Sequence, residues 1–109
     1  MHWLRPWSTV DVDSVEFTTL QAELERELSA MHPLQAMVPL VIGRRTGSDD
    51  IVVKLKDGRV AVVHLTWVNE LNQNRETYPS SKCFASFEHF AQQRMAPDAK
   101  DYALDHHEI

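Results

Sequence analysis

One stretch of the chain, residues 51–67, restricts the possible folds more than any other; it reads IVVKLKDGRVAVVHLTW. Asp57 and Gly58 separate two runs that are rich in β-branched residues. An Asp-Gly pair between such runs is the strongest short-range indication of a β-hairpin with a type I′ turn, in which both turn residues have positive φ. With that turn, Leu55 would lie opposite Val60. The sequence therefore predicts an antiparallel hairpin at the centre of the fold.

This pairing gives the hairpin two different faces, because successive side chains of a strand point to opposite sides. The first face would belong to the core; its residues are Ile51, Val53, Leu55, Val60, Val62 and His64. The second would be polar near the turn and apolar at its far end; its residues are Val52, Lys54, Lys56, Ala61, Val63, Leu65 and Trp67. We therefore expect a helix on the first face and a smaller cover over the apolar end of the second.

An amphipathic helix is predicted before the hairpin, over residues 13–31. Its apolar side chains recur every three or four positions and would face the sheet: Phe17, Leu20, Leu24, Leu28 and Met31. Two capping-box spacings compete for its first turn, Asp13 with Glu16 and Thr18 with Gln21. The charged residues off this stripe are expected in solvent; they are Glu23, Glu25, Arg26 and Glu27.

Residues 34–45 are predicted to form a third strand. It should lie at a sheet edge or break there, because Pro39 has no N–H to donate to a neighbouring strand. The polar turn at residues 46–50 would join it to the hairpin. The predicted fold is therefore α+β, a three-stranded antiparallel meander packed by the N-terminal helix and followed by a C-terminal helix.

The C-terminal helix is predicted from Phe87 to Met95 after a polar loop at residues 68–82, with Ser86 as its N-cap and a further helical turn restarting at Pro97. The 109 residues are expected to form one domain. Residues 1–12 contain Trp3 and Trp7 and would pack on this domain as an arm, since free tails are poor in aromatic residues. Residues 105–109 are polar and would fray.

The composition excludes some classes of function. A net charge of −5 and a pI near 5.6 do not fit a nucleic-acid binder, which needs a basic face, and are compatible with a basic protein partner. Cys83 is the single cysteine, so no internal disulfide can form. No apolar run is long enough to span a membrane, and the first residues lack the form of a secretory signal. We therefore expect a cytoplasmic protein.

The sequence contains no recognisable catalytic or metal-binding motif. The 6 histidines lack the spacing of a local zinc site, so neither a metal nor another cofactor is expected. His64 is the most interesting residue, because Asp50 lies across the hairpin and an Asp–His hydrogen bond is available. The pair would fix the strand end, or His64 would act as a base in a cleft with Asp50 and Arg44. Arg44 or Arg45 is expected to pair with Asp49 or Asp50 across the turn.

Several short segments follow one another in a recognisable order: His32-Pro33-Leu34, Arg44-Arg45 before Asp49-Asp50, AVVHLTW at residues 61–67, Ser86-Phe87-Glu88 and Arg94-Met95. In these segments, over residues 20–102, the chain resembles a group of small uncharacterised bacterial proteins. No activity is assigned to that group. The resemblance therefore implies a bacterial cytosolic setting and supplies no catalytic residues.

We expect a non-catalytic protein-binding module, such as an immunity-type protein that neutralises a basic toxin. The alternative is a small ligand-binding domain or an enzyme that uses His64, Asp50 and Arg44. A homodimer formed through sheet edges is compatible with either. The partner surface is predicted where the hairpin meets the polar loop, since aromatic residues and arginine dominate interface energetics. Its residues are Trp67, Glu70, Arg75, Glu76 and Tyr78.

Overall fold

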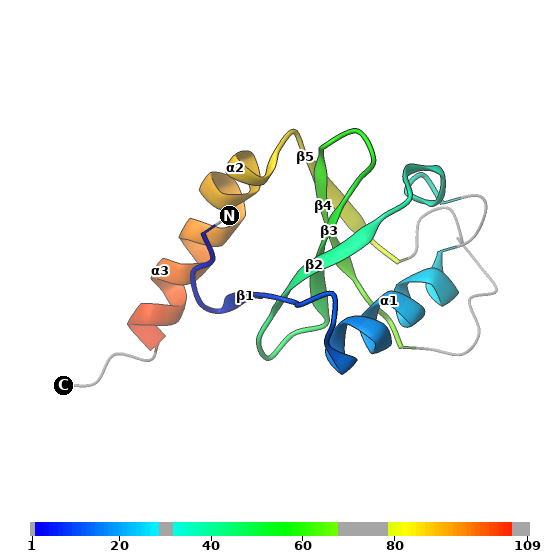
Figure 1. Ribbon diagram of the computed structural model, residues 1–109. Coiled ribbons are helices and arrows are strands. Elements are labelled where there is room, and N and C mark those ends of the chain that lie inside the picture. Colours follow the sequence, from blue (N-terminus) through cyan, green and yellow to red (C-terminus); the bar gives the residue numbers. More distant parts are fainter. Residues whose placement is uncertain (1, 29–31, 68–78, 106–109) are drawn as a thin grey trace.

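The computed structural model describes residues 2–28, 32–67 and 79–105 of the chain. Its centre is a five-stranded antiparallel sheet whose strands follow one another in sequence order (Figure 1). The strands are β1 (Trp7–Thr9), β2 (Leu40–Arg45), β3 (Asp50–Lys54), β4 (Val60–His64) and β5 (Ser81–Phe84). The predicted α+β class with an antiparallel sheet and a C-terminal helix is confirmed. The predicted number of strands was wrong, because the structure adds one strand at each edge.

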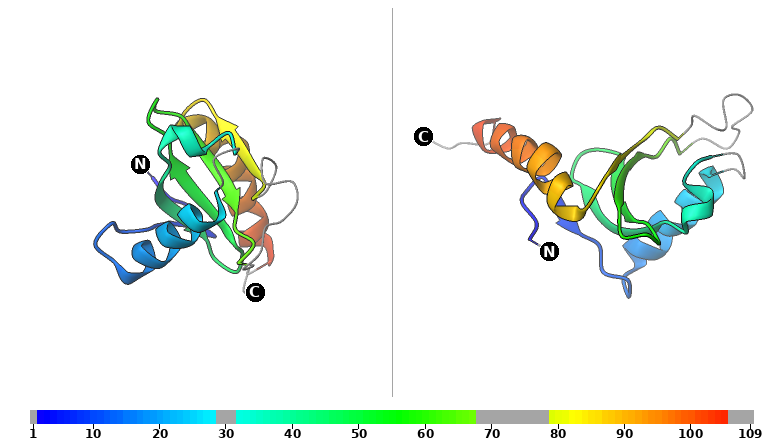
Figure 2. Two further views of the ribbon diagram at one scale, coloured as in Figure 1. Left: turned by 90° about the vertical axis from the view of Figure 1, so that its right-hand side faces the viewer. Right: turned by 90° about the horizontal axis from the view of Figure 1, so that it is seen from above.

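The sheet separates two apolar layers. Helices lie on both sides of it (Figure 2). On one face lies α1 (Val15–Glu27), and on the other lies a helical stretch made of α2 (Phe87–Phe90), a π-helical turn (Ala91–Met95) and α3 (Ala96–Asp105). We call the first the α1 layer; its buried residues include Leu20, Leu24, Ile51, Val53, Ala61, Val63 and Leu65. We call the second the C-terminal layer; it contains Trp7, Val52, Val60, Val62, Phe84, Phe90 and Met95.

α1 begins directly after Ser14, whose hydroxyl accepts a hydrogen bond from the Phe17 N–H at 3.0 Å. Neither predicted capping box supplies the N-cap. Several hydroxyl and carboxylate side chains within one turn can cap a helix, so spacing alone did not decide between them. The helix ends at Glu27 and is shorter than predicted, because Leu28 already has an extended backbone. Leu24 on the predicted apolar stripe is completely buried.

The central hairpin has a three-residue loop instead of the predicted type I′ turn. The Leu55 N–H donates to the Arg59 carbonyl at 2.9 Å, and the Gly58 N–H donates to the Leu55 carbonyl at 3.0 Å. Gly58 has a φ of +91°, while Asp57 is not among the described residues with positive φ. A glycine in the left-handed region is characteristic of three-residue hairpin loops. The extra loop residue moves the register by one, so that Lys54 lies opposite Val60.

This shift reverses the faces of β4, because a slip of one residue moves every side chain of a strand to the other side. Ala61 and Val63 lie in the α1 layer, where Val60 and Val62 were predicted. Val60 and Val62 lie in the C-terminal layer instead. The predicted core position of His64 was also wrong, since its side chain is 56% exposed.

Neither edge strand was predicted, because β1 is very short and β5 is mostly polar. β1 is the tripeptide WST and pairs with β2, with Trp7 opposite Arg45. β5 reads SKCF, and three of its four residues are exposed. Short, polar strands are typical of sheet edges. β2 therefore lies inside the sheet and not at the edge that Pro39 suggested; Pro39 precedes the strand and removes none of its hydrogen bonds.

The C-terminal helix begins as predicted at Ser86, whose hydroxyl accepts from the His89 N–H at 3.2 Å. The predicted restart at Pro97 was wrong, since helical structure continues without a break to Asp105. Just before the proline, the Ala96 N–H donates to the Ala91 carbonyl, five residues back. Proline has no N–H and crowds the preceding turn, so a locally widened helix can include it without ending.

Candidate functional site

Two of the residues singled out in the sequence meet at the end of the hairpin away from its loop. Asp50 and His64 lie opposite each other in the β3–β4 register, with His64 Nδ1 2.7 Å from Asp50 Oδ1. The Asp50 side chain is only 13% exposed. When Asp50 is ionised, the proton of a neutral His64 ring lies on Nδ1, between the two residues. Nε2 is then the nitrogen left for solvent or a ligand.

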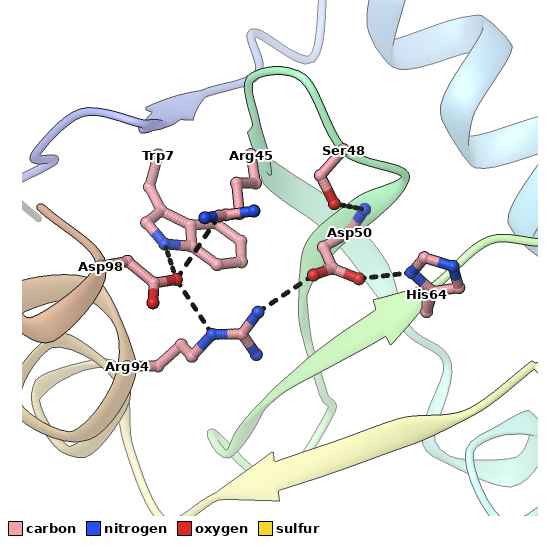
Figure 3. Close-up of polar contacts among 7 residues, drawn as sticks. All are labelled: Trp7, Arg45, Ser48, Asp50, His64, Arg94 and Asp98. Carbon is pink, nitrogen blue, oxygen red and sulfur yellow. Dashed lines mark hydrogen bonds and ion pairs between the residues drawn. The ribbon is translucent and has the colours of Figure 1, made fainter. Parts of the chain in front are cut away.

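The Asp50 carboxylate also connects the sheet to the C-terminal helix (Figure 3). Arg94, in the π-helical turn, donates from Nη2 to Asp50 Oδ2 and from Nε to Asp98 Oδ2, both at 3.0 Å. Asp98 in turn accepts from the Trp7 indole N–H at 2.9 Å and lies 3.5 Å from Nε of Arg45. The Arg94 guanidinium carbon is 5.3 Å from the centre of the Trp7 ring. Arg94 is therefore held from several sides in one orientation.

The third residue of the predicted cleft, Arg44, lies on the other face of the sheet. It pairs in register with Ile51, and its Nη1 is 2.6 Å from Glu16 Oε2 on α1. The predicted pairing of Arg44 or Arg45 with an aspartate of the adjacent turn was wrong. Arg44 is paired with Glu16, and Arg45 lies near Asp98. The structure therefore assembles His64 and Asp50 with Arg94, which the sequence did not suggest.

A polar pocket of about 170 Å³ opens beside this cluster. We call it the polar pocket; it is lined by Asp50, Val62, His64, Ser80, Ser81, Lys82 and Arg94. His64 and Lys82 lie on the same face of the sheet, because Lys82 is paired with Val62 and side chains alternate along β4. The pocket therefore draws its polar groups from three strands and the C-terminal helix.

Glu27 forms a second polar centre, on the α1 side of the sheet. Its side chain has no exposed surface, although the sequence placed it on a solvated face. Oε1 accepts from the Thr66 N–H at 2.8 Å and from the Thr66 hydroxyl at 2.9 Å, and Oε2 accepts from the Trp67 N–H at 2.9 Å. A buried carboxylate with these partners fixes the main chain just after β4.

Trp67 has a strained backbone at this anchor. Its φ is +57°, in the left-handed region that residues with a β-carbon rarely occupy. The residue is nevertheless 44% exposed. A strained residue persists only where its surroundings hold it, and such residues cluster at functional sites. The carboxylate of Glu27 supplies the restraint here.

Trp67 also borders a cleft of about 330 Å³ between α1 and the sheet. We call it the Trp67 cleft; its apolar lining is Leu20, Ile51, Leu65 and Trp67, and its polar lining includes Glu16, Thr19, Arg44, Ser48, Asp49 and Asp50. Glu16 is paired with Arg44. Asp49 has no side-chain hydrogen bond or ion pair to any of the described residues. The cleft therefore combines an apolar base with a net acidic rim.

The titration of two neighbouring glutamates follows from their surroundings. Burial raises the pKa of Glu27, and the adjacent Glu23 raises it further, while the hydrogen bonds from Thr66 and Trp67 oppose this shift. The hydrogen bond from Arg26 lowers the pKa of Glu23. Glu23 therefore carries the negative charge more readily than Glu27 does.

The remaining predicted interface residues, Glu70, Arg75, Glu76 and Tyr78, lie outside the described residues. Among the residues that sequence reasoning missed, Arg94 had only a partial local signal: Asp98 lies 4 positions further along the same helix, but Asp50 is 44 positions away. Glu27 had a clearer one: it follows Leu20 and Leu24 at helical spacing and so extends their buried face.

No group of three or more histidine, cysteine, aspartate or glutamate side chains suited to a metal ion occurs within the described ranges. The single cysteine, Cys83, is exposed on β5. In the same part of the chain, no helix combines the length and the apolar character needed to cross a membrane.

Comparison with known proteins adds no further assignment: no protein-family model, no curated protein and no solved structure matches this chain.

Proposed function

We propose that the protein is a non-catalytic protein-binding module that docks a basic partner at the Trp67 cleft. The observation that carries this proposal is the strained backbone of Trp67, which a buried carboxylate restrains while the residue stays 44% exposed. Backbone strain of this kind lowers the stability of the protein. A contact between the exposed Trp67 ring and a partner protein best explains why the strained conformation is kept. Tryptophan is also among the residues most enriched at the energetic centres of interfaces.

The residues that line the Trp67 cleft indicate which side chain of a partner would bind there. An apolar base beside an exposed indole accepts the aliphatic part of a long side chain, and the indole face attracts a cation. Asp49 is exposed and lines the cleft, where it is available as a counter-charge. An arginine or lysine of a partner protein satisfies all three features. The net charge of −5 would also accelerate the approach of a basic partner. An immunity-type protein that neutralises a basic toxin is the most concrete form of this function.

The experiment compares Trp67→Ala with Leu104→Ala as bait in a quantitative pull-down from cells that express the protein. Leu104 is 69% exposed on α3, so its removal takes away a similar apolar contact elsewhere. We expect a basic protein to be retained by the parent and by Leu104→Ala and lost with Trp67→Ala. Calorimetry on the purified pair should show weaker binding to Asp49→Lys, and binding within a few-fold of the parent for His64→Gln.

Two results would contradict the proposal. One is a partner that Trp67→Ala binds as tightly as the parent does, with both proteins folded by circular dichroism. The other is binding that depends on His64 and not on Trp67, which would favour the alternative of a ligand-binding domain or an enzyme.

A further inference from the structure

The polar pocket lies on the opposite face of the sheet from the Trp67 cleft and has the opposite electrostatic character. Two permanent cations, Lys82 and Arg94, line it together with His64. The one carboxylate in its lining, Asp50, already contacts both Arg94 and His64. The pocket is therefore locally cationic in a protein whose net charge is −5. Such a reversal is a feature of anion-binding sites.

Two donors of the pocket, Arg94 and His64, are set in place before any ligand arrives. Arg94 is bonded to Asp50 and Asp98 and packs near the Trp7 ring. These contacts use Nε and Nη2, and no described residue accepts a hydrogen bond from Nη1. His64 is held through Nδ1. A fixed arginine and a fixed imidazole lose little side-chain entropy when they bind a ligand.

The arrangement of these donors favours a tetrahedral oxyanion over a planar one. Lys82 comes from the edge strand β5, His64 from β4 and Arg94 from the helix, and residues Ser80 and Ser81 border the same space. Nε and Nη2 of Arg94 are already divided between Asp98 and Asp50, so that side of the guanidinium cannot bind both oxygens of one further carboxylate. A phosphate presents several oxygens in different directions and can meet donors that approach from separate elements.

We propose that the polar pocket binds a phosphate group, either as the free ion or as the terminal group of a small phosphate monoester. Lys82 and Arg94 are the charged donors, and Ser80 supplies a neutral one. His64 contributes through Nε2: it donates to a phosphate oxygen when the ring is protonated, and it accepts from a P–OH group when the ring is neutral. Asp50 is a positioning residue, because its two oxygens hold His64 and Arg94 in their orientations. The pocket volume of about 170 Å³ holds one such group, with any organic part extending into solvent.

In the test, inorganic phosphate is the probe and is titrated into the full chain. Heteronuclear NMR follows the binding. Glycerol 3-phosphate and acetate are titrated in parallel at constant ionic strength, with chloride replacing each anion. We expect phosphate to shift the resonances of Ser81, Lys82 and His64 in a saturable way, and acetate to shift them much less. Glycerol 3-phosphate that binds at least as tightly as phosphate would identify a monoester as the ligand, whereas binding of phosphate alone would identify the free ion.

The matched variants are Lys82→Gln and Lys100→Gln. Both lysines are exposed, and Lys100 lies on α3, outside the pocket. Because a charge-assisted hydrogen bond is lost, Lys82→Gln should weaken phosphate binding about tenfold, while Lys100→Gln leaves it unchanged. His64→Gln should weaken binding as well and leave the thermal unfolding transition in place. Equal binding by both lysine variants, shifts spread over the whole surface, or equal binding of acetate and phosphate would overturn the inference.

Discussion

A carboxylate that is removed from water needs hydrogen-bond donors, and the described structure gives Glu27 two backbone N–H groups and one hydroxyl. These donors belong to Thr66 and Trp67, so a single side chain of α1 sets the main-chain path at the end of β4. The backbone of Trp67 is strained. Its hydrogen bond to Glu27 stabilises this conformation. At the scale of single residues, the Trp67 cleft therefore depends on a glutamate that does not line it.

We predict that Glu27→Gln destabilises the protein by about 1–3 kcal/mol, the usual cost of leaving a buried donor without its acceptor. An amide has an NH2 group in place of one carboxylate oxygen, so either Thr66 or Trp67 loses its acceptor and faces a donor instead. Urea denaturation measures the loss, and the indole NMR signal of Trp67 should broaden or move. An unchanged midpoint together with an unchanged indole signal would show that Glu27 does not restrain Trp67.

The loss of stability caused by Glu27→Gln should depend on pH, with a sign that follows from the pKa of Glu27. Burial raises the pKa of Glu27 above its ordinary value of 4.5, so the native state binds this proton more tightly than the unfolded state does. The stability that this group contributes is fully present below pH 4.5 and is lost as the pH rises through the native pKa. The destabilisation by Glu27→Gln should therefore be largest in acid and smaller at pH 7. A difference that grows with pH would mean that the pKa is lowered instead.

At the scale of secondary structure, the hairpin shows what could be predicted and what could not. The alternation of Ile51 and Val53 identified the core face of β3, and Gly58 correctly marked the loop. The loop length could not be obtained from the Asp-Gly pair, because two-residue and three-residue loops both use a glycine with positive φ. One residue of error was enough to assign Val62 to the wrong layer.

The outer elements were harder to predict, since their stability comes from the rest of the molecule. β1 has only 3 residues and β5 only 4, and both are held by pairing with β2 and β4. The candidate site could be predicted only in part for the same reason. The Asp50–His64 contact is local to one hairpin, whereas Arg94 reaches it from a helix far along the chain.

The loop itself gives the second prediction. Gly58 has a φ of +91°, so a β-branched residue there is strained even though no atom lies within 4 Å of a β-carbon at that position. Gly58→Val should lower the free energy of unfolding by more than about 1 kcal/mol. Lys56→Ala in the same exposed loop is the control and should change stability little. Chemical denaturation that finds the two variants equal would show that this backbone conformation is not required.

At the scale of the whole molecule, the two candidate sites lie on opposite faces of one sheet. The Trp67 cleft is acidic at its rim and the polar pocket is cationic, and Asp50 lines both. The C-terminal layer is closed by aromatic contacts from the N-terminal arm, where Trp3 packs edge-to-face on Phe87 at 5.1 Å and Trp7 on Phe90 at the same distance. This arm is therefore a structural part of the domain.

Gly43 provides the third prediction, because it lies under that arm. A β-carbon there would be 2.2 Å from Cη2 of Trp3 and 2.9 Å from the Ser8 carbonyl oxygen, so Gly43→Ala must displace both. We expect a loss of stability of about 1–3 kcal/mol from overpacking and faster amide hydrogen exchange in β1. The effect should be smaller in a Trp3→Ala background, where the ring is absent. Additive losses in this double-mutant cycle would mean that Trp3 is not the obstacle.

The contact between the Trp7 indole and Asp98 spans 91 positions of sequence, and this separation has a consequence for synthesis. During translation α1 and strands β2 to β4 leave the ribosome well before Asp98 does, so the α1 layer can form while Trp7 and Val62 still lack their cover. The ribosome adds about 5–20 residues per second, so the apolar face that contains Val62 stays uncovered for seconds. We therefore expect nascent chains that end before the C-terminal helix to need a chaperone, and full-length chains to release it.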